Sequence, residues 1–504
     1  MKKLKKILFG RLFITALLIL LQFLLHFLFL YYLSTYSSAI YSLMIGVSLL
    51  LVIAVVNDDT DPSFKLAWVI AMLVLPFFSW ALYLLFGHSK IKTSRQKNYI
   101  QSEENHRSTE TTTDDIIDEN PDFLRQYEFL KNSADARVFR NTETKFFPCG
   151  EEFFPEYLQA LESAEKFIFM EYFIISQGEV WDKVSDILEK KAADGVDVRI
   201  MFDDMGTIAL LPHNFVKTLA KVGIKAVAFN RMRPSIDPFL NHRDHRKITV
   251  IDGKTAFTGG LNIADEYMNI NSPYGYWKDY ALRLDGDAVE SLTRMFLQLW
   301  EFATGEPVVD VTQYFTEHRC ACDGYVIPYC DSPINHRYPG KHAALNMISS
   351  AKKYIWITTP YLILDDATAT ALRLAAKSGV DVRIITPHIP DKKAVFQVTR
   401  ANYPSLVKSG VKIYEFTEGF IHAKSILCDD MYAIIGTMNF DFRSFYFHFE
   451  NSVFLYKSNA IKELKSDNEK IFLTATEITD DDIRKTNIFV KIYRSVLKLF
   501  APFL

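Results

Sequence analysis

The chain contains the hexapeptide Gly195-Val-Asp-Val-Arg-Ile200 twice, the second copy being Gly379-Val-Asp-Val-Arg-Ile384. Each copy follows an amphipathic segment, over 181–193 and 367–377, and places a glycine directly before a Val/Ile-rich stretch. A helix that ends at glycine and leads into a β-branched strand is typical of a βαβ unit in a parallel sheet. The repeated stretch therefore predicts an α/β fold.

The repeat extends on both sides of the hexapeptide. Residues 162–171 correspond to 349–358, and residues 219–225 correspond to 406–412, both at an offset of 187. Several blocks that recur in the same order at nearly one offset indicate that one unit is used twice. We predict two copies of one α/β unit, the first over 135–315 and the second over 316–460.

Each copy then reaches a His-x-Lys-x4-Asp pattern followed by Gly-x-x-Asn. Residues two apart on a strand face the same side, so each His and Lys should project together. An imidazole beside an ammonium suits a phosphate, whose remaining oxygens the Asn amides and backbone N–H groups can bind. If the copies pack face to face, one His can attack phosphorus while the other protonates the leaving oxygen. The matching positions, all 177 residues apart, are His245, Lys247, Asp252 and Asn262 in the first copy and His422, Lys424, Asp429 and Asn439 in the second.

Three stretches near the start of the chain carry no charge: Leu12 to Leu33, Ala39 to Val56 and Leu66 to Gly87. Each has about the 20 residues that cross a bilayer core. They predict two or three transmembrane helices in a membrane region over 1–90. Basic residues flank both the first and the third stretch, which leaves the number of spans and the side of the remaining chain open.

Two further segments differ in composition from the repeats. Residues 91–134 are rich in acidic and small polar residues, which predicts a surface linker that can hold a short helix around Phe123 to Leu130. Residues 461–504 are predicted to form a tail whose end, over 488–504, is an amphipathic helix. This helix either lies at a membrane interface or packs against the domain.

The net charge is small and excludes one broad class of protein. The 504 residues contain 57 Lys and Arg against 60 Asp and Glu, which gives a formal net charge of -3. This balance argues against a protein whose main partner is a nucleic-acid backbone. The sequence also shows no acidic cluster typical of a metal site, so we expect neither a metal nor another cofactor.

With its paired His-x-Lys-x4-Asp motifs the chain resembles the phospholipase D superfamily. Within that superfamily it is most similar to the bacterial cardiolipin synthases, which implies two pseudo-twofold-related α/β/α sandwich repeats behind N-terminal transmembrane helices in the cell membrane. The extra run Leu12 to Leu33 departs from the two spans usual in that family. The matching segments are Leu66-Ala-Trp-Val-Ile-Ala-Met-Leu-Val-Leu-Pro76, Gly259-Gly-Leu-Asn-Ile-Ala-Asp-Glu-Tyr267, Gly275-Tyr-Trp-Lys-Asp279 and Phe420-Ile-His-Ala-Lys424.

The resemblance implies that one phosphatidylglycerol is attacked by His245 and releases glycerol protonated by His422. A second phosphatidylglycerol, deprotonated by His422, then gives cardiolipin. The alternative is a membrane-bound phospholipase D that hydrolyses phospholipids to phosphatidic acid. The order of the two His, the use of phosphatidylethanolamine and the formation of a homo-oligomer stay open. The remaining expected roles are phosphate binding by Asn262, Asn439 and Thr437, orientation of the two His by Asp279 and Glu450, and structural ion pairs at Asp252 and Asp429 within the catalytic motifs.

Overall fold

The fold is described from a computed structural model. It describes residues 24, 27–28, 31–32, 38–58, 60–74, 83, 93–107, 120–232, 238–308, 310–318, 320 and 324–503. The chain divides into two compact units, one formed by 1–90 with 232–239 and the other by 91–231 with 240–504.

The first unit contains the helices α3 (Ser38–Val56) and α4 (Pro62–Val74), which pack against each other. A small apolar cluster joins them, with Val55 and Met72 buried. None of the helices within the described residues is both long and apolar enough to cross a membrane. Most of the run Leu12 to Leu33 and most of 75–87 lie outside the described residues, so the predicted transmembrane helices are not confirmed.

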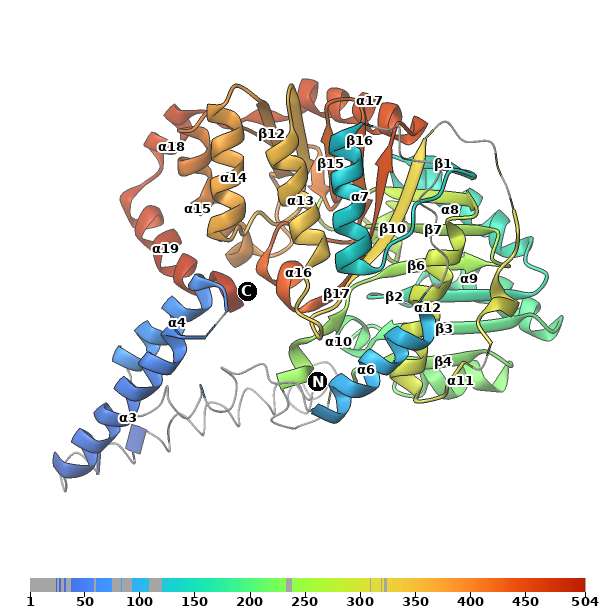
Figure 1. The fold of residues 1–504 in the computed structure, drawn as a ribbon, viewed down its shortest axis with the longest axis horizontal. Helices are drawn as coiled ribbons and strands as arrows, with labels where there is room; N and C mark the ends of the chain where they lie inside the picture. The colour runs from blue at the N-terminus through green and yellow to red at the C-terminus, as the bar shows by residue number, and fades with distance from the viewer. Residues whose placement is uncertain are drawn as a thin grey trace. The chain divides into compact units, whose positions relative to one another are not determined.

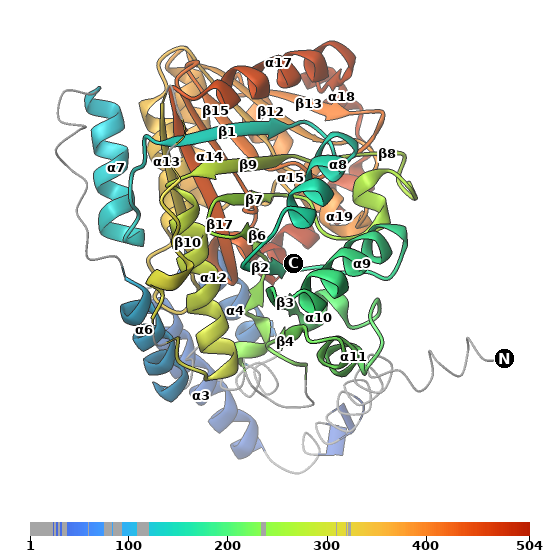
Figure 2. The ribbon, with the colours of Figure 1, turned by 90° about the vertical axis from the view of Figure 1, so that its right-hand side faces the viewer.

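The first repeat is built on one mixed sheet. Its strands lie in the order β1-β9-β7-β6-β2-β3-β4, with β2, β3 and β4 parallel and the others antiparallel (Figure 2). Apolar side chains of α8, α9 and α11 share a core with the sheet, and α12 packs on the sheet as well. The bounds are β1 Thr142–Phe147, α8 Gly150–Glu162, β2 Phe167–Tyr172, α9 Glu179–Ala193, β3 Asp197–Asp203, α10 Asp204–Thr207, α11 Phe215–Lys221, β4 Lys225–Phe229, β6 Lys247–Ile251, β7 Thr255–Gly259, β9 Ala281–Gly286 and α12 Val289–Thr304.

The second repeat follows the same plan, with β10-β17-β16-β15-β11-β12-β13 in the corresponding order and a short β18 at the end (Figure 1). The hexapeptides lead into β3 and β12, the middle strands of the two parallel triplets. The bounds are β10 Tyr325–Asp331, α13 Pro339–Ser350, β11 Tyr354–Thr358, α14 Asp366–Lys377, β12 Asp381–Pro387, α15 Lys393–Val407, β13 Lys412–Phe416, β15 Ser425–Cys428, β16 Tyr432–Gly436, α16 Phe442–Tyr446, β17 His448–Tyr456, α17 Asn459–Thr474 and β18 Thr476–Glu477. The prediction of a duplicated α/β unit is confirmed.

The two repeats exchange short strands. Strand β5 (Arg243–Asp244) of the first repeat pairs in parallel with β17 of the second. Strand β14 (Gly419–Ile421) of the second repeat pairs in parallel with β8 (Tyr276–Lys278) of the first. Because β5 and β14 directly precede the two catalytic motifs, this exchange fixes each motif against the opposite repeat.

The segment predicted as a surface linker with a short helix around Phe123 to Leu130 contains more structure than expected in its described residues, although the predicted helix is present within α7 (Pro121–Ala134). Helices α6 (Thr93–His106) and α7 occupy this segment. Tyr99 is buried and its ring lies 5.8 Å from that of Phe449, while Phe123 belongs to the core of the second repeat. The segment is polar overall because each helix turns only one narrow apolar face towards the body, which a composition average does not reveal.

The predicted tail over 461–504 is wrong in its first part. Helix α17 carries Asp467, whose carboxylate binds Lys278 Nζ of the first repeat at 2.9 Å. It also packs on β1 of the first repeat and on β13 and β15 of the second, so α17 is part of the folded body. After β18 the chain forms α18 (Asp480–Lys485), α19 (Ile488–Leu499) and a short 3-10 turn, η6 (Ala501–Phe503). The amphipathic helix is thus present where the sequence predicted it.

Candidate active site

The two motif histidines are placed by matching backbone contacts with the opposite repeat. His245 N donates to the carbonyl of Phe449 at 2.9 Å, and His422 N donates to the carbonyl of Lys278 at 2.7 Å. Both His residues lie just before a strand, β6 or β15, rather than on it as the spacing suggested. Each Lys side chain still turns back to its own His: Lys247 Nζ donates to the His245 carbonyl at 2.8 Å, and Lys424 Nζ donates to that of His422.

Each histidine ring is held by a carboxylate from the other repeat. His245 Nδ1 lies 2.9 Å from Glu450 Oε2, and His422 Nδ1 lies 2.6 Å from Asp279 Oδ2. When Nδ1–H donates to the carboxylate, the lone pair of Nε2 is left available for chemistry. Both carboxylates were predicted from the sequence. Each one reaches the histidine of the other repeat because of the exchanged strands β5 and β14.

Burial and neighbouring cations tune the four basic groups of the site. Burial, together with the charge of Lys247, lowers the pKa of His245 well below its usual value, and burial with the charge of Lys424 lowers the pKa of His422 to about 4. Burial also lowers the pKa of Lys247 to about 7 and that of Lys424 to about 8. Because Lys424 and His422 both act on His245, the two motifs form one electrostatic site. Because these basic groups repel one another, a bound anion would be stabilised in this site.

The two orienting carboxylates are shifted in opposite directions. Burial raises the pKa of Glu450 well above its usual value, although Lys247 opposes the shift. Burial also acts to raise the pKa of Asp279, but the charges of Lys424 and His422 outweigh it, and the pKa is lowered. Asp279 therefore holds its negative charge more readily than Glu450 does, and it favours a protonated His422 more than Glu450 favours a protonated His245.

The motif aspartates directly follow β6 and β15 and, within the part of the chain that the structure describes, do not form the ion pairs that the sequence suggested. Asp252 accepts the backbone N–H groups of residues 165–167 at 2.7 to 2.8 Å. Asp429 accepts those of residues 352–354 at 2.7 to 2.9 Å. Both adopt a positive φ, 53° and 52°, which an Asp in a tight turn tolerates. Through these hydrogen bonds, Asp252 fixes the turn before β2 and Asp429 fixes the turn before β11.

Two of the three expected phosphate ligands are already engaged within the protein. Asn262 accepts the Ile174 N–H at 2.9 Å and donates to the Tyr267 hydroxyl at 2.7 Å. The Thr437 hydroxyl donates to Glu450 Oε2 and so supports the carboxylate rather than pointing at a phosphate. Asn439 is buried; among the described residues its Oδ1 has no hydrogen-bond partner, while its side chain hydrogen-bonds the Asp441 carboxylate.

His448 is a site residue that the sequence analysis missed. Its ring lies 5.3 Å from that of His245, and its Nδ1 lies 3.4 Å from Glu450 Oε1. The corresponding residue of the other half is Trp277, whose ring lies 5.5 Å from that of His422. The signal was available, since each of these residues stands two positions before an orienting carboxylate.

One group of metal-binding side chains occurs among the described residues. His245, His448 and Glu450 place ligand atoms within 4.8 Å of one another. The ammonium groups of Lys247 and Lys424 face the same site and oppose a divalent cation there. The charges of the site thus suit an anion better than a metal ion.

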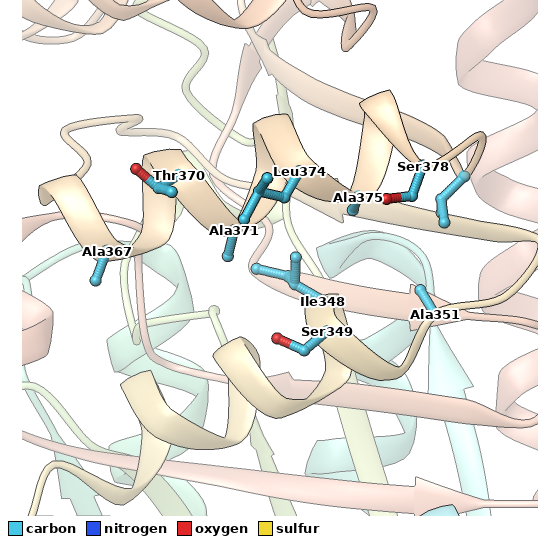
Figure 3. A pocket seen from close by; sticks show the side chains of 10 residues that line it. Ile348, Ser349, Ala351, Ala367, Thr370, Ala371, Leu374, Ala375 and Ser378 are labelled. Carbon is cyan, nitrogen blue, oxygen red and sulfur yellow. The ribbon is translucent and has the colours of Figure 1, made fainter.

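A separate hollow of about 400 Å³ lies between α13 and α14 (Figure 3). It contains no ionisable side chain, so it offers neither a nucleophile nor a phosphate ligand and is not the reaction centre. Its lining consists of Ile348, Ser349, Ala351, Ala367, Thr370, Ala371, Leu374, Ala375, Ser378 and Val380.

Family models match both the repeats and the N-terminal region. The model described as the phospholipase D-like domain of cardiolipin synthase matches residues 157–300 and 344–472. The model described as phospholipase D-nuclease N-terminal matches residues 46–88. The first match contains both His-x-Lys-x4-Asp motifs together with Asp279 and Glu450.

Curated relatives align over most of the chain. Cardiolipin synthase 2 of Bacillus cereus is 36% identical over 458 residues, which cover 89% of this chain and 88% of the relative. Cardiolipin synthase of Alkalihalophilus pseudofirmus is 35% identical over 456 residues, which cover 89% and 90%. Among solved structures, the phosphatidylserine synthase of Haemophilus influenzae Rd KW20 superposes with a TM-score of 0.58 at 15% identity, covering 76% of this chain and 98% of that one. This last likeness shows a shared fold.

Proposed function

Because the chain belongs to the cardiolipin synthase family of the phospholipase D superfamily, we propose that it transfers a phosphatidyl group from one phosphatidylglycerol to another. The products are cardiolipin and glycerol. The observation that carries the proposal is the pair of buried histidines, each held by a carboxylate of the opposite repeat within one cationic site. The chemistry requires one nucleophile and one acid–base group on either side of a phosphodiester, and the pair supplies both.

In the first half-reaction, Nε2 of neutral His245 attacks phosphorus. The P–N bond forms, the bond from phosphorus to the glycerol oxygen breaks, and His422 gives its proton to that oxygen. In the second half-reaction, His422 removes the proton from a hydroxyl of the second phosphatidylglycerol. The new P–O bond then forms as the P–N bond breaks, and neither step consumes a nucleotide.

The carboxylates support His245 as the nucleophile. A nucleophile must be neutral, whereas the acid must hold a proton, and the ionised Asp279 stabilises an imidazolium at His422. The raised pKa of Glu450 leaves His245 without equal support for a positive charge. A bound phosphodiester adds a negative charge that raises the pKa of His422 and of both lysines, so the substrate itself charges the acid.

Lys247, Lys424 and Asn439 are the side chains best placed to bind the phosphate. The two lysines supply charge at the transition state, and the side-chain NH₂ group of Asn439, whose side chain hydrogen-bonds Asp441 in the free protein, is the hydrogen-bond donor that we propose for the phosphate. In this proposal Asn262 and Thr437 do not bind the phosphate. They hold Tyr267 and Glu450 in place through hydrogen bonds.

The N-terminal region attaches the enzyme to the bacterial cell membrane in this proposal, as a multi-pass segment. The support is the three uncharged runs in the sequence, the absence of charge throughout α3, and the family match over 46–88. Attachment keeps the enzyme beside phosphatidylglycerol and other membrane lipids.

The test uses the purified full chain with phosphatidylglycerol labelled in its phosphate. We expect cardiolipin and free glycerol from the wild type, and a loss of at least about 10⁴-fold in His245→Ala and in His422→Ala. Acid-labile label on His245 of the His422→Ala chain would identify the nucleophile. Phosphatidic acid in place of cardiolipin would establish the hydrolase instead, and full activity in His245→Ala would refute the two-histidine mechanism.

A further inference from the structure

Helix α19 presents a continuous apolar face to solvent. Six large side chains recur with helical spacing along it and are 40 to 77% exposed. With about 100° of rotation per residue, they fill one broad sector of the helix. An exposed apolar patch of this kind marks an interaction surface. The α19 face consists of Ile488, Phe489, Ile492, Tyr493, Val496 and Leu499.

The opposite side of α19 fixes the helix to the catalytic body. Arg494 Nε donates to Gln397 Oε1 of α15 at 2.9 Å, and Val490 and Leu497 are partly buried on the same side. The Asn487 side chain caps the helix by accepting the Phe489 N–H at 2.8 Å. The helix is therefore preformed, and its exposed face has a fixed orientation relative to the second repeat (Figure 1).

The charges of the segment suit an anionic surface. Residues 488–504 contain Lys491, Arg494 and Lys498 and no acidic residue. Lys491 and Lys498 lie in the sector between the α19 face and the side that packs on α15. Large apolar side chains bordered by lysines are the pattern of a helix that lies in the interface of a bilayer containing anionic lipid.

The segment is also connected to the reaction centre. The turn η6 follows α19, buries Ala501 and Pro502, and packs on α16. Helix α16 supplies Ser444, whose hydroxyl accepts the Asn439 N–H at 3.1 Å, and Arg443, whose Nε donates to His448 Nε2 at 3.3 Å. Helix α16 thus connects η6 to Asn439 and His448, and the ring of His448 lies 5.3 Å from that of His245.

We propose that the α19 face docks the catalytic body onto the surface of an anionic bilayer, so that lipid substrate passes from the membrane to the buried histidines. The proposal rests on the proposed function, because it assigns to the surface the delivery of phosphatidylglycerol. It adds a second membrane contact, separate from the N-terminal region.

Photo-crosslinking tests the occupant of the face directly. The full chain carries p-benzoyl-phenylalanine in place of Phe489 and is reconstituted in vesicles of phosphatidylglycerol and phosphatidylcholine. We expect cross-links to lipid. The same amino acid in place of Leu473, an 87% exposed residue on α17, is the control and should give little lipid adduct. Cross-links to the chain's own residues before 93, or to a second copy, would overturn the proposal.

Kinetics test the delivery role. In the triple variant Phe489→Ser, Ile492→Ser, Val496→Ser, we expect turnover of vesicle phosphatidylglycerol to fall about tenfold or more, because most of the inserted apolar area is lost. Turnover of short-chain, water-soluble phosphatidylglycerol should stay within about twofold of the wild type, as should both activities of Leu473→Ser. Equal losses on both substrates, or no loss on vesicles, would overturn the proposal. A wild type that cross-links to lipid but forms no cardiolipin would refute the reaction and leave the surface intact.

Discussion

His245 and His422 each direct Nδ1 at a carboxylate of the opposite repeat, yet the surroundings of the two carboxylates differ. Glu450 accepts the Thr437 hydroxyl and lies beside His448. Asp279 accepts its own neighbour's N–H, that of Tyr280, at 2.8 Å, and Gly260 stands where the other half has Thr437. The backbone frame is duplicated, while the side chains that set the charge of each carboxylate are not.

This comparison indicates how a duplicated fold yields two different histidines. The exchanged strands impose the same geometry on both, so the proposed division into nucleophile and acid has to come from neighbouring side chains. A longer carboxylate with a raised pKa serves one half and a shorter, ionised one serves the other. Substitutions at corresponding positions should therefore have unequal effects.

The largest difference is expected between Asp279→Asn and Glu450→Gln. Asp279→Asn removes the charge that stabilises protonated His422, and kcat should fall about 10³-fold. Glu450→Gln keeps an acceptor for His245 Nδ1 and replaces a carboxyl group whose pKa is already raised, so the loss should be about tenfold. Steady-state cardiolipin formation by both variants, with thermal midpoints to establish folding, measures the ratio. Equal losses would mean that the two halves are electrostatically alike.

A second contrast concerns the residue behind each carboxylate. A Cβ added at Gly260 would lie 1.9 Å from Asp279 Oδ1, so Gly260→Ala must displace the carboxylate from His422. We expect a loss of about 100-fold in kcat, since small displacements of a catalytic group are costly. Thr437→Val removes the hydrogen bonds of the hydroxyl to Glu450 and to the backbone of Asn451 without pushing the carboxylate away, so it should cost less than about tenfold. A Gly260→Ala chain as active as Thr437→Val would contradict the close packing at Asp279.

The duplicated fold and the site residues could be predicted because they leave local signals. The two hexapeptides identify β3 and β12, and the paired motifs identify both histidines and lysines. The family resemblance read from those motifs is confirmed by the relatives and the matching family model. A pattern that occurs twice at matching positions is more specific than a single occurrence, which is why the repeat could be recognised.

The features that could not be predicted depend on contacts between distant segments. Glu450 and Asp279 were selected, but nothing local indicates that each serves the other repeat's histidine through β5 and β14. Helix α6 and the full length of α7 were missed within the predicted linker, where only a short helix around Phe123 to Leu130 was considered, because their apolar faces are narrow. Thr437 was assigned to phosphate because a hydroxyl next to a motif has no visible partner until the fold brings Glu450 beside it.

Substitutions of the two motif aspartates should have equal effects, in contrast to the unequal effects expected at the carboxylates and at the residues behind them. Asp252→Ala and Asp429→Ala each remove the acceptor of a set of backbone N–H bonds before β2 or β11. Each should lower the free energy of unfolding by about 2 kcal/mol, while kcat of the folded enzyme stays within about threefold. Asp→Asn at the same positions tolerates the positive φ and should cost roughly half as much. Denaturant unfolding measures both. A loss of activity without a loss of stability would mean that these two aspartates take part in the reaction itself.

The smallest effect is expected at His448, which distinguishes the nucleophile's half from the other. Burial lowers the pKa of His245 most, but the charges of Lys247 and His448 contribute. His448→Asn removes one of these contributions, so the pKa of His245 should rise. A larger fraction of the nucleophile is then protonated on the acid side, and the acid limb of the kcat/KM profile should move to higher pH. At neutral pH the loss should be only about two- to fivefold.

Trp277→Phe, at the corresponding position beside His422, provides the matched control for His448→Asn. It alters packing without removing a basic group, so its acid limb should stay in place. If His448→Asn left the acid limb unmoved as well, or moved it to lower pH, His448 would contribute only packing. The charge asymmetry would then have to arise entirely from the two carboxylates and from the residues behind them.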